Sequence, residues 1–521
     1  MSSSLWGVAT MPESKPTPAP GPCLLVPGLC GSVLHVRGVG EEGEGRREWI
    51  VAERADAAFR ALWGRYCPDS REIQSLTQEE VIIPTGGLND GGLYACDLLD
   101  PSLNILPPAA LRYFHTLIQT MTREWGHVPG HSLHGFPYDF RQSNLRHLEA
   151  LLAKLERISG ANGGVKVDVI SHSMGGLVVK LLLAKYPTQC ARLVRSWVAI
   201  AAPFNGAPGF TADALLTGVQ FVSGWANYFF VQRETLRQMV CQAPSIFELL
   251  PSGDMDWGHE AGTPRVTIRL TGPVDELGEE GSIPVVAPQA AAAATVVAGE
   301  GEKEGSEGDE EEAPVEGSRY TFNIADDGLR ELLRLCMRDN EVTLQEKGIP
   351  LPLVDEILDH AMEMRSLLAK AELPPDCKML NLFGTGLPTP FSCAYGTEAA
   401  PLQSLASLSD GSTTAVFETL DGDGTVPAVS ARRDGLAAFQ RVGLTGDHRQ
   451  LMELPASLDL IHGFLSEVAN DEAVSVGDEG DELEGHGERR HLSHFYTGMR
   501  YWPYCTEPDE LPEVEGGWLM V

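Results

Sequence analysis

The chain has 521 residues and carries 73 acidic against 39 basic side chains, a formal net charge of −34. Nucleic-acid binding needs basic side chains that neutralise phosphates, so this charge balance argues against DNA and RNA as partners. It also disfavours broad adsorption to anionic lipid, although a local patch can still dock on a membrane. Hydrophobic residues make up 43% of the sequence, enough for a sizeable core.

The N-terminal segment, residues 1–22, lacks a basic start and a continuous apolar stretch, so we expect a disordered leader and no secretory signal. The sequence has no run of about eighteen apolar residues, which predicts no membrane-spanning helix. Its ten cysteines form no C-x-x-C pair, so zinc-ribbon spacing is absent and most thiols are expected to be reduced and buried. We therefore expect a cytoplasmic location and leave open peripheral contact with an intracellular membrane.

Short apolar runs alternate with helical patterns along the chain. Strands are predicted from Cys23 onward and at Val165–Ile170, Ser196–Phe204 and Met379–Gly386; helices are predicted at Ala109–Trp125, Asn144–Ile158 and Gly176–Tyr186. Near-continuous apolar strands that alternate with helices are typical of a mostly parallel sheet covered on both faces. The fold class predicted is therefore α/β.

The domain organisation follows from changes in composition. Residues 23–204 and 376–467 are predicted to form the two parts of the sheet domain, and residues 205–375 an inserted cap. Within the cap, about 275–318 is rich in Ala, Gly and Glu and is expected to be disordered. Residues 468–521 form an acidic tail, which the same argument predicts to be solvated.

The stretch VDVISHSMGGLVVK places Ser173 between a predicted strand and a predicted helix. A nucleophile elbow has the form G-x-S-x-G in this strand–turn–helix context. Ser171 replaces the first glycine, a small residue in a tight turn, and Gly175 supplies the second. The alternative interpretation is a serine in an ordinary glycine-rich turn.

An activated serine needs a base and an acid that orients the base, and in the hydrolase order both follow the serine in the chain. Asp423 in LDGDGTVP follows the apolar run AVFETL, with Asp421 as the second choice and a plain Asp/Gly turn as the alternative. His448 in LTGDHRQLM is the predicted base. His462 lies in an apolar helical pattern that favours a packing role.

An oxyanion hole needs two backbone N–H donors. The residue after the nucleophile, Met174, is expected to supply one. Leu29 in VPGLCGS, the loop after the first predicted strand, is expected to supply the other. Acyl transfer through these groups requires no metal and no organic cofactor.

Six segments together resemble the lecithin:cholesterol acyltransferase family, and within it the plant-type phospholipase A branch. They are, in chain order, VPGLCGS, GFPYDFR, SHSMGG, IAAPFNGAP, PSIFELLPS and DGDGTVP, and the resemblance runs from about Cys23 to Leu465. It implies an α/β-hydrolase fold with a cap and a mobile lid, a triad of Ser173, Asp423 and His448, and oxyanion donors at Leu29 and Met174.

Two departures from the family accompany the Ser171 substitution. Animal members are secreted and carry a lid disulfide, whereas the lid-like segment here, about 46–66, has no cysteine pair. Animal phospholipase members have an acid where this chain has Leu29. The first departure favours an intracellular enzyme; the second puts acidic-compartment behaviour in doubt.

The resemblance predicts a serine-dependent lipid acyl hydrolase or acyltransferase that cleaves a fatty acyl ester of glycerophospholipids. The acceptor, water or a lipid alcohol, and the oligomeric state stay open. Trp49 and Trp63 in the lid-like segment, with Phe204, are candidates for contact with substrate or a lipid surface; packing within the cap is the alternative. The other functional alternatives are a carboxylesterase or neutral-lipid lipase, and a catalytically inactive lipid-binding or scaffold protein.

Overall fold

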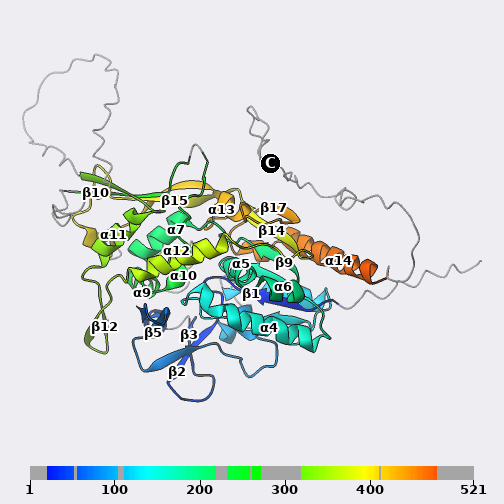
Figure 1. Cartoon of the computed structure of the whole chain (residues 1–521). Coiled ribbons are helices and arrows are strands. Elements are labelled where there is room, and N and C mark those ends of the chain that lie inside the picture. The colour runs from blue at the N-terminus through cyan, green and yellow to red at the C-terminus, as the bar shows by residue number, and fades with distance from the viewer. Residues whose placement is uncertain are drawn as a thin grey trace, which may run out of the picture.

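The computed structural model describes residues 20–51, 55–103, 111–218, 232–258, 261–271, 318–409 and 412–477 (Figure 1). Almost all of the predicted leader, nearly the whole acidic insert and residues 478–521 of the predicted tail lie outside these ranges. Within them, no helix is long and apolar enough to cross a bilayer.

A six-stranded sheet with the order β17-β14-β9-β8-β1-β7 forms the centre of the molecule. Its strands are β1 (Cys23–Val26), β7 (Leu133–Gly135), β8 (Val167–His172), β9 (Val194–Ile200), β14 (Lys378–Thr385) and β17 (Gln440–Thr445). All neighbouring pairs are parallel. The predicted α/β class with a mostly parallel sheet is therefore confirmed.

Every residue of β8 and β9 is buried, as expected for strands of a parallel sheet that helices cover on both faces. One group is α4 (Leu148–Ala161), α5 (Gly175–Lys185) and α6 (Pro187–Leu193), which pack on one another and on β8 and β9. A second group is α3 (His115–Arg123) and α14 (Pro455–Gly477), joined by a stacked pair of rings, Trp125 and His462, 4.9 Å apart. Helix α14 continues past residue 467, where the sequence places the start of the tail.

A second sheet, with the order β11-β10-β15-β16, lies along the upper edge of Figure 1. Its strands are β10 (Arg265–Leu270), β11 (Ser318–Asn323), β15 (Leu387–Tyr395) and β16 (Val416–Gly422). Strand β15 pairs with β10 from the predicted cap and β16 pairs with β15, so these two strands of the 376–467 segment lie in the second sheet and not in the central one. The physical reason is exposure: most of β16 is exposed or half-buried, as an edge strand permits and a central parallel strand does not.

The remaining elements around this second sheet belong to the cap, apart from α13, which precedes β17. They are α7 (Pro208–Thr217), α9 (Arg233–Val240), α10 (Pro244–Phe247), α11 (Asp327–Met337), α12 (Glu356–Leu368), α13 (Ala428–Arg432) and the hairpin β12 (Glu341–Leu344) with β13 (Lys347–Pro350). Helix α12 packs on both α5 and α10, so the cap rests directly on the helix that follows Ser173.

The N-terminal region that includes the lid-like segment (about 46–66) forms small antiparallel units at the bottom of Figure 1. It contains β2 (Leu34–Gly38), β3 (Arg46–Trp49), α1 (Ala55–Ala61), β4 (Gly64–Cys67), β5 (Glu72–Ser75), β6 (Glu79–Ile82) and, further on, α2 (Tyr94–Asp97). Strands β3, β2 and β6 form one sheet and β4 pairs with β5. All cysteines in the described part of the chain are free, including Cys30 and Cys67 on either side of this segment.

Candidate active site

Ser173 occupies the turn between β8 and α5 with a φ of +55°, a left-handed conformation that few non-glycine residues adopt. The turn is tight because its neighbours lack side chains. A Cβ on Gly28 would lie 2.6 Å from the Cβ of Ser173, and a Cβ on Gly175 would lie 2.5 Å from the carbonyl oxygens of Val26 and Pro27. The strand–turn–helix context predicted for Ser173 is therefore present.

Ser171, which stands where the elbow pattern has glycine, is fully buried at the end of β8. Its Oγ accepts a hydrogen bond from the indole Nε1 of Trp197 on the neighbouring strand β9, at 2.8 Å. A buried indole N–H needs an acceptor, and a glycine could not supply one. The departure from the pattern thus has a structural cause in the adjacent strand.

His448 lies in the loop after β17 and contacts both predicted partners. Its Nε2 is 2.8 Å from Oγ of Ser173, and its Nδ1 is 2.7 Å from Oδ2 of Asp423. The preceding Asp447 stabilises the loop, because its Oδ1 accepts the amides of Arg449 and Gln450. The Ser173 residue is 9% exposed and the His448 side chain 14%, so the three groups meet in a nearly closed site.

Asp423 follows β16 directly and is 1% exposed. Its Oδ1 accepts the amides of Thr425 and Val426, at 2.9 and 2.7 Å, which leaves Oδ2 to face the imidazole. Its carbonyl also accepts the amide of His448, so backbone and side chain hold the two loops together. Asp421, the second choice, is exposed and accepts the amide of Gly386 instead.

The predicted oxyanion donors, the amides of Met174 and Leu29, belong to the two segments that meet at Ser173. Met174 is the N-cap residue of α5, where helix N–H groups and the helix dipole favour negative charge. Leu29 follows Gly28, which touches the nucleophile turn. Among the described residues, no hydrogen bond outside helices and strands has the Met174 or Leu29 amide as its donor.

The predicted substrate-contact residues lie in the core instead. Trp49 is fully buried, donates its Nε1 to the Cys30 carbonyl and packs on Phe59 at 4.8 Å. Trp63 is buried and donates its Nε1 to the carbonyl of Thr235 in the cap. Contact with a lipid surface and packing within the cap were the two interpretations of these rings; their burial and the internal acceptor of each indole N–H favour packing.

Phe204 is likewise buried, between Trp197 and the ammonium group of Lys180. His462, the alternative base, stacks on Trp125 and takes the packing role that its helical pattern predicts. Neither residue contacts the Ser173–His448 pair in the described structure. The aromatic candidates therefore serve packing, and the three predicted polar residues are the ones that the fold brings together.

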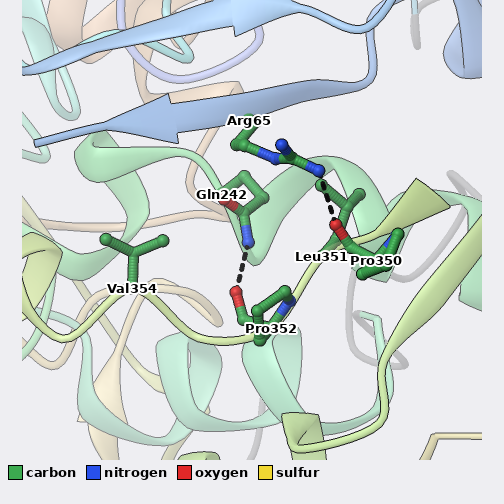
Figure 2. A pocket seen from close by; sticks show the side chains of 6 residues that line it. All are labelled: Arg65, Gln242, Pro350, Leu351, Pro352 and Val354. Carbon is green, nitrogen blue, oxygen red and sulfur yellow. Dashed lines mark hydrogen bonds between the residues drawn. The ribbon is translucent and has the colours of Figure 1, made fainter.

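A pocket of about 540 Å³ lies away from these residues, between β4 and the chain after β13 (Figure 2). Leu351, Pro352 and Val354 form its apolar wall. Its two polar side chains already hold that wall: Arg65 donates to the Pro350 carbonyl and Gln242 to the Pro352 carbonyl. We therefore assign this pocket to cap packing. The described residues contain no group of three or more His, Cys, Asp or Glu arranged to hold a metal.

Two further residues contact the site and were not predicted, Tyr113 and His172. Tyr113 lies between α2 and α3, and His172 is the last residue of β8. Their hydrogen bonds join them to Gly28 and His448. His172 adjoins Ser173 in sequence, but only the folded chain shows that its side chain points toward the His448 loop.

A parallel sheet in which a serine with a left-handed backbone conformation stands between a strand and the following helix is the arrangement of the α/β-hydrolase fold. A family model described as "Lecithin:cholesterol acyltransferase" matches residues 79–275. The chain is 35% identical over 437 residues to lecithin-cholesterol acyltransferase-like 4 of Arabidopsis thaliana, covering 83% of this chain and 72% of that protein. It is 34% identical over 450 residues to phospholipase A(1) LCAT3 of the same plant, covering 85% and 90%.

A shorter match, 29% identical over 120 residues, is to the lysosomal phospholipase A and acyltransferase of Canis lupus familiaris; it covers 22% of this chain and 28% of that protein. The two plant matches extend over most of both chains. The chain therefore belongs to the lecithin:cholesterol acyltransferase family.

Proposed function

We propose that this protein is a phospholipase A and acyltransferase that forms an acyl-enzyme on Ser173. The observation that carries the proposal is the continuous contact from Ser173 Oγ through the His448 ring to the Asp423 carboxylate, at 2.8 and 2.7 Å. A serine hydroxyl is a weak nucleophile, and a base within hydrogen-bond distance activates it. Both contacts have the length that proton transfer requires.

The hydrogen bonds assign the roles within this triad. The Asp423 carboxylate accepts from His448 Nδ1–H, which leaves Nε2 free to take the hydroxyl proton of Ser173. Oγ then bonds to the acyl carbon, and Nε2 carries the proton to the oxygen of the leaving lysolipid. Asp423 stabilises the imidazolium that exists between the two transfers. Its own charge is stabilised by the amides of Thr425 and Val426.

The negative charge of the tetrahedral intermediate develops on the former carbonyl oxygen of the ester. The amides of Leu29 and Met174 are the donors proposed for it, aided by the N-terminus of α5. The acyl-enzyme is then attacked by water, which releases a fatty acid, or by a lipid alcohol, which yields a new ester. His448 acts as base for this second attack by the same geometry.

The substrate class rests on the relatives. Two of them carry names that state phospholipase A activity, and one of these names also states acyltransferase activity. We propose a glycerophospholipid as the acyl donor, presented by a lipid surface. A carboxylesterase or neutral-lipid lipase would use the same triad, so the substrate must be tested directly.

The test uses the full chain with Ser173→Ala and, as a matched control, Ser366→Ala. Ser366 is exposed on α12 and bonds only within its own helix. We expect Ser173→Ala to abolish both fluorophosphonate labelling and lysolipid release from phosphatidylcholine vesicles, and Ser366→Ala to retain both. Product mass spectrometry with and without a sterol or diacylglycerol then identifies the acceptor.

Full activity in Ser173→Ala would refute the nucleophile. Failure of the folded wild-type protein to react with the probe would instead favour a lipid-binding protein without turnover. Faster hydrolysis of triacylglycerol emulsions than of phosphatidylcholine vesicles would identify a neutral-lipid lipase and refute the proposed substrate class.

A further inference from the structure

A buried chain of hydrogen bonds runs beside the triad, from the loop after β1 to the loop that carries His448. Its first contact is from the Gly28 amide to Oη of Tyr113, at 2.8 Å. The second joins Oη of Tyr113 to Nδ1 of His172, at 2.7 Å, and the third joins Nε2 of His172 to the carbonyl oxygen of His448, at 2.9 Å. Tyr113 and His172 are both buried.

The direction of each hydrogen bond follows from the acceptor at the end of the chain. A carbonyl oxygen only accepts, so Nε2 of His172 carries a hydrogen. Burial holds the pKa of His172 well below its usual value, so the ring is neutral and Nδ1 is an acceptor. Tyr113 therefore donates its hydroxyl hydrogen to His172 and accepts the Gly28 N–H on its lone pair. Every donor and acceptor in the chain is satisfied in this arrangement.

The two ends of this chain lie at the two loops that the proposed mechanism uses. Gly28 precedes Leu29, the proposed oxyanion donor. Gly31, two residues beyond Leu29, packs on the same tyrosine so closely that a Cβ there would lie 2.4 Å from the ring of Tyr113. At the other end, His172 holds the backbone of His448 and packs against its ring, with centroids 4.8 Å apart.

We propose that Tyr113 and His172 are positioning residues that hold the oxyanion loop and the proposed base in one fixed geometry. The inference rests on the proposed function, since it assigns these residues a role in the same acyl transfer. Neither side chain touches the reacting atoms in the proposal. Their effect is to keep the Leu29 amide and the His448 ring aligned, which a preorganised site requires before charge develops on the substrate.

The first variant is Tyr113→Phe, which keeps the ring and removes only the hydroxyl. Loss of one oxyanion donor costs about a hundredfold or more in kcat, and a misaligned donor should lose part of that. We expect kcat per fluorophosphonate-labelled site to fall by about tenfold, with KM little changed. Counting labelled sites removes any contribution from unfolded protein.

The matched control is Tyr395→Phe. Tyr395 is as deeply buried, and its hydroxyl donates to the buried carboxylate of Asp213 in the cap, at 2.9 Å. Both variants remove a buried tyrosine hydroxyl: Tyr113→Phe loses the bonds to Gly28 and His172, and Tyr395→Phe loses the bond to Asp213. A merely structural role for Tyr113 would make the two variants alike, with lower melting temperatures and wild-type kcat per labelled site.

Two substitutions of His172 separate the halves of the chain. Asparagine can accept from Tyr113 near the position of Nδ1 but cannot reach the His448 carbonyl, whereas glutamine can donate near the position of Nε2. We expect both to lower kcat per labelled site, and His172→Gln to retain more of the wild-type pH–rate profile because it still holds the loop of the base. If Tyr113→Phe does not fold, these two variants still test whether the hydrogen-bonded chain positions the proposed base.

Wild-type kcat per labelled site in Tyr113→Phe, or in both His172 variants, would overturn the positioning role. The proposed function would still stand if Ser173→Ala were inactive in the same assay. Failure of the wild-type protein to label and to transfer acyl groups would instead refute the proposed function, and with it the positioning role.

Discussion

Replacing Ser171 by glycine, the residue that the elbow pattern has there, should destabilise this protein while leaving its chemistry in place. The change removes the Ser171 hydroxyl that accepts the hydrogen bond of the Trp197 indole, a 2.8 Å bond between two fully buried residues. A buried donor without a partner costs about 1–3 kcal/mol. Glycine inside a strand costs about 0.5–1 kcal/mol more. We expect the free energy of unfolding to fall by about 2–4 kcal/mol.

The assay is urea-induced unfolding of wild type, Ser171→Gly, Trp197→Phe and the double variant. A phenylalanine side chain at position 197 has no N–H group to satisfy. In that background, Ser171→Gly should lower the free energy of unfolding only by the cost of glycine within a strand, about 0.5–1 kcal/mol. The coupling energy of the cycle should then be about 1–3 kcal/mol. An equal effect of Ser171→Gly in both backgrounds would refute the hydrogen-bond explanation. Fluorophosphonate labelling of the folded Ser171→Gly protein should persist.

Three further predictions concern the site and its surroundings. Asp423→Asn should lower kcat by about four orders of magnitude, because an amide cannot stabilise the imidazolium; the exposed Asp421→Asn should not, and equal losses in steady-state assays would contradict the assignment. Gly28→Ala should slow fluorophosphonate labelling, because its Cβ would lie 2.6 Å from the nucleophile's Cβ; the control Gly160→Ala, in open space on α4, should leave the labelling rate unchanged. Burial raises the pKa of Glu248 from 4.5 to about 7, so its contribution to folding is fully present below about pH 4.5 and is lost as the pH rises through about 7. Urea unfolding at about pH 5 and about pH 8 should show wild type losing about 2–3 kcal/mol relative to Glu248→Gln over this range, and a pH-independent difference would refute the raised pKa.

Much of the fold was predictable because its signals are local. The apolar runs at β8, β9 and β14 are long enough to require burial on both faces, and glycine or proline ends the helices between them. The elbow around Ser173 is a strand–turn–helix whose parts are contiguous in the chain. His448 follows β17 and Ser173 follows β8, and the carboxyl ends of these parallel strands lie at one edge of the same sheet, so their meeting follows from the same pattern. Asp423 follows β16 of the second sheet, so its meeting with His448 depends on the tertiary structure.

Other features depend on contacts between distant segments, which periodicity does not contain. Strand β16 has the apolar run of a strand, but only its pairing with β15 shows that it belongs to the cap sheet. For Trp49 and Trp63 the sequence leaves open lipid contact or packing, and only the structure shows that the carbonyls accepting their indole N–H groups lie in other elements. No local pattern reports whether a large ring faces solvent or a distant backbone oxygen.

By itself, the sequence determined the α/β class, the order of strands and helices and the residues to examine at the site, since these depend on local periodicity and on motif spacing. Only the tertiary structure decided which groups satisfy one another inside the protein. It joined Ser171 to Trp197, and Tyr113 through His172 to the His448 loop. A buried polar group needs a partner wherever the fold supplies one, and that partner is chosen by packing in three dimensions rather than by position along the chain.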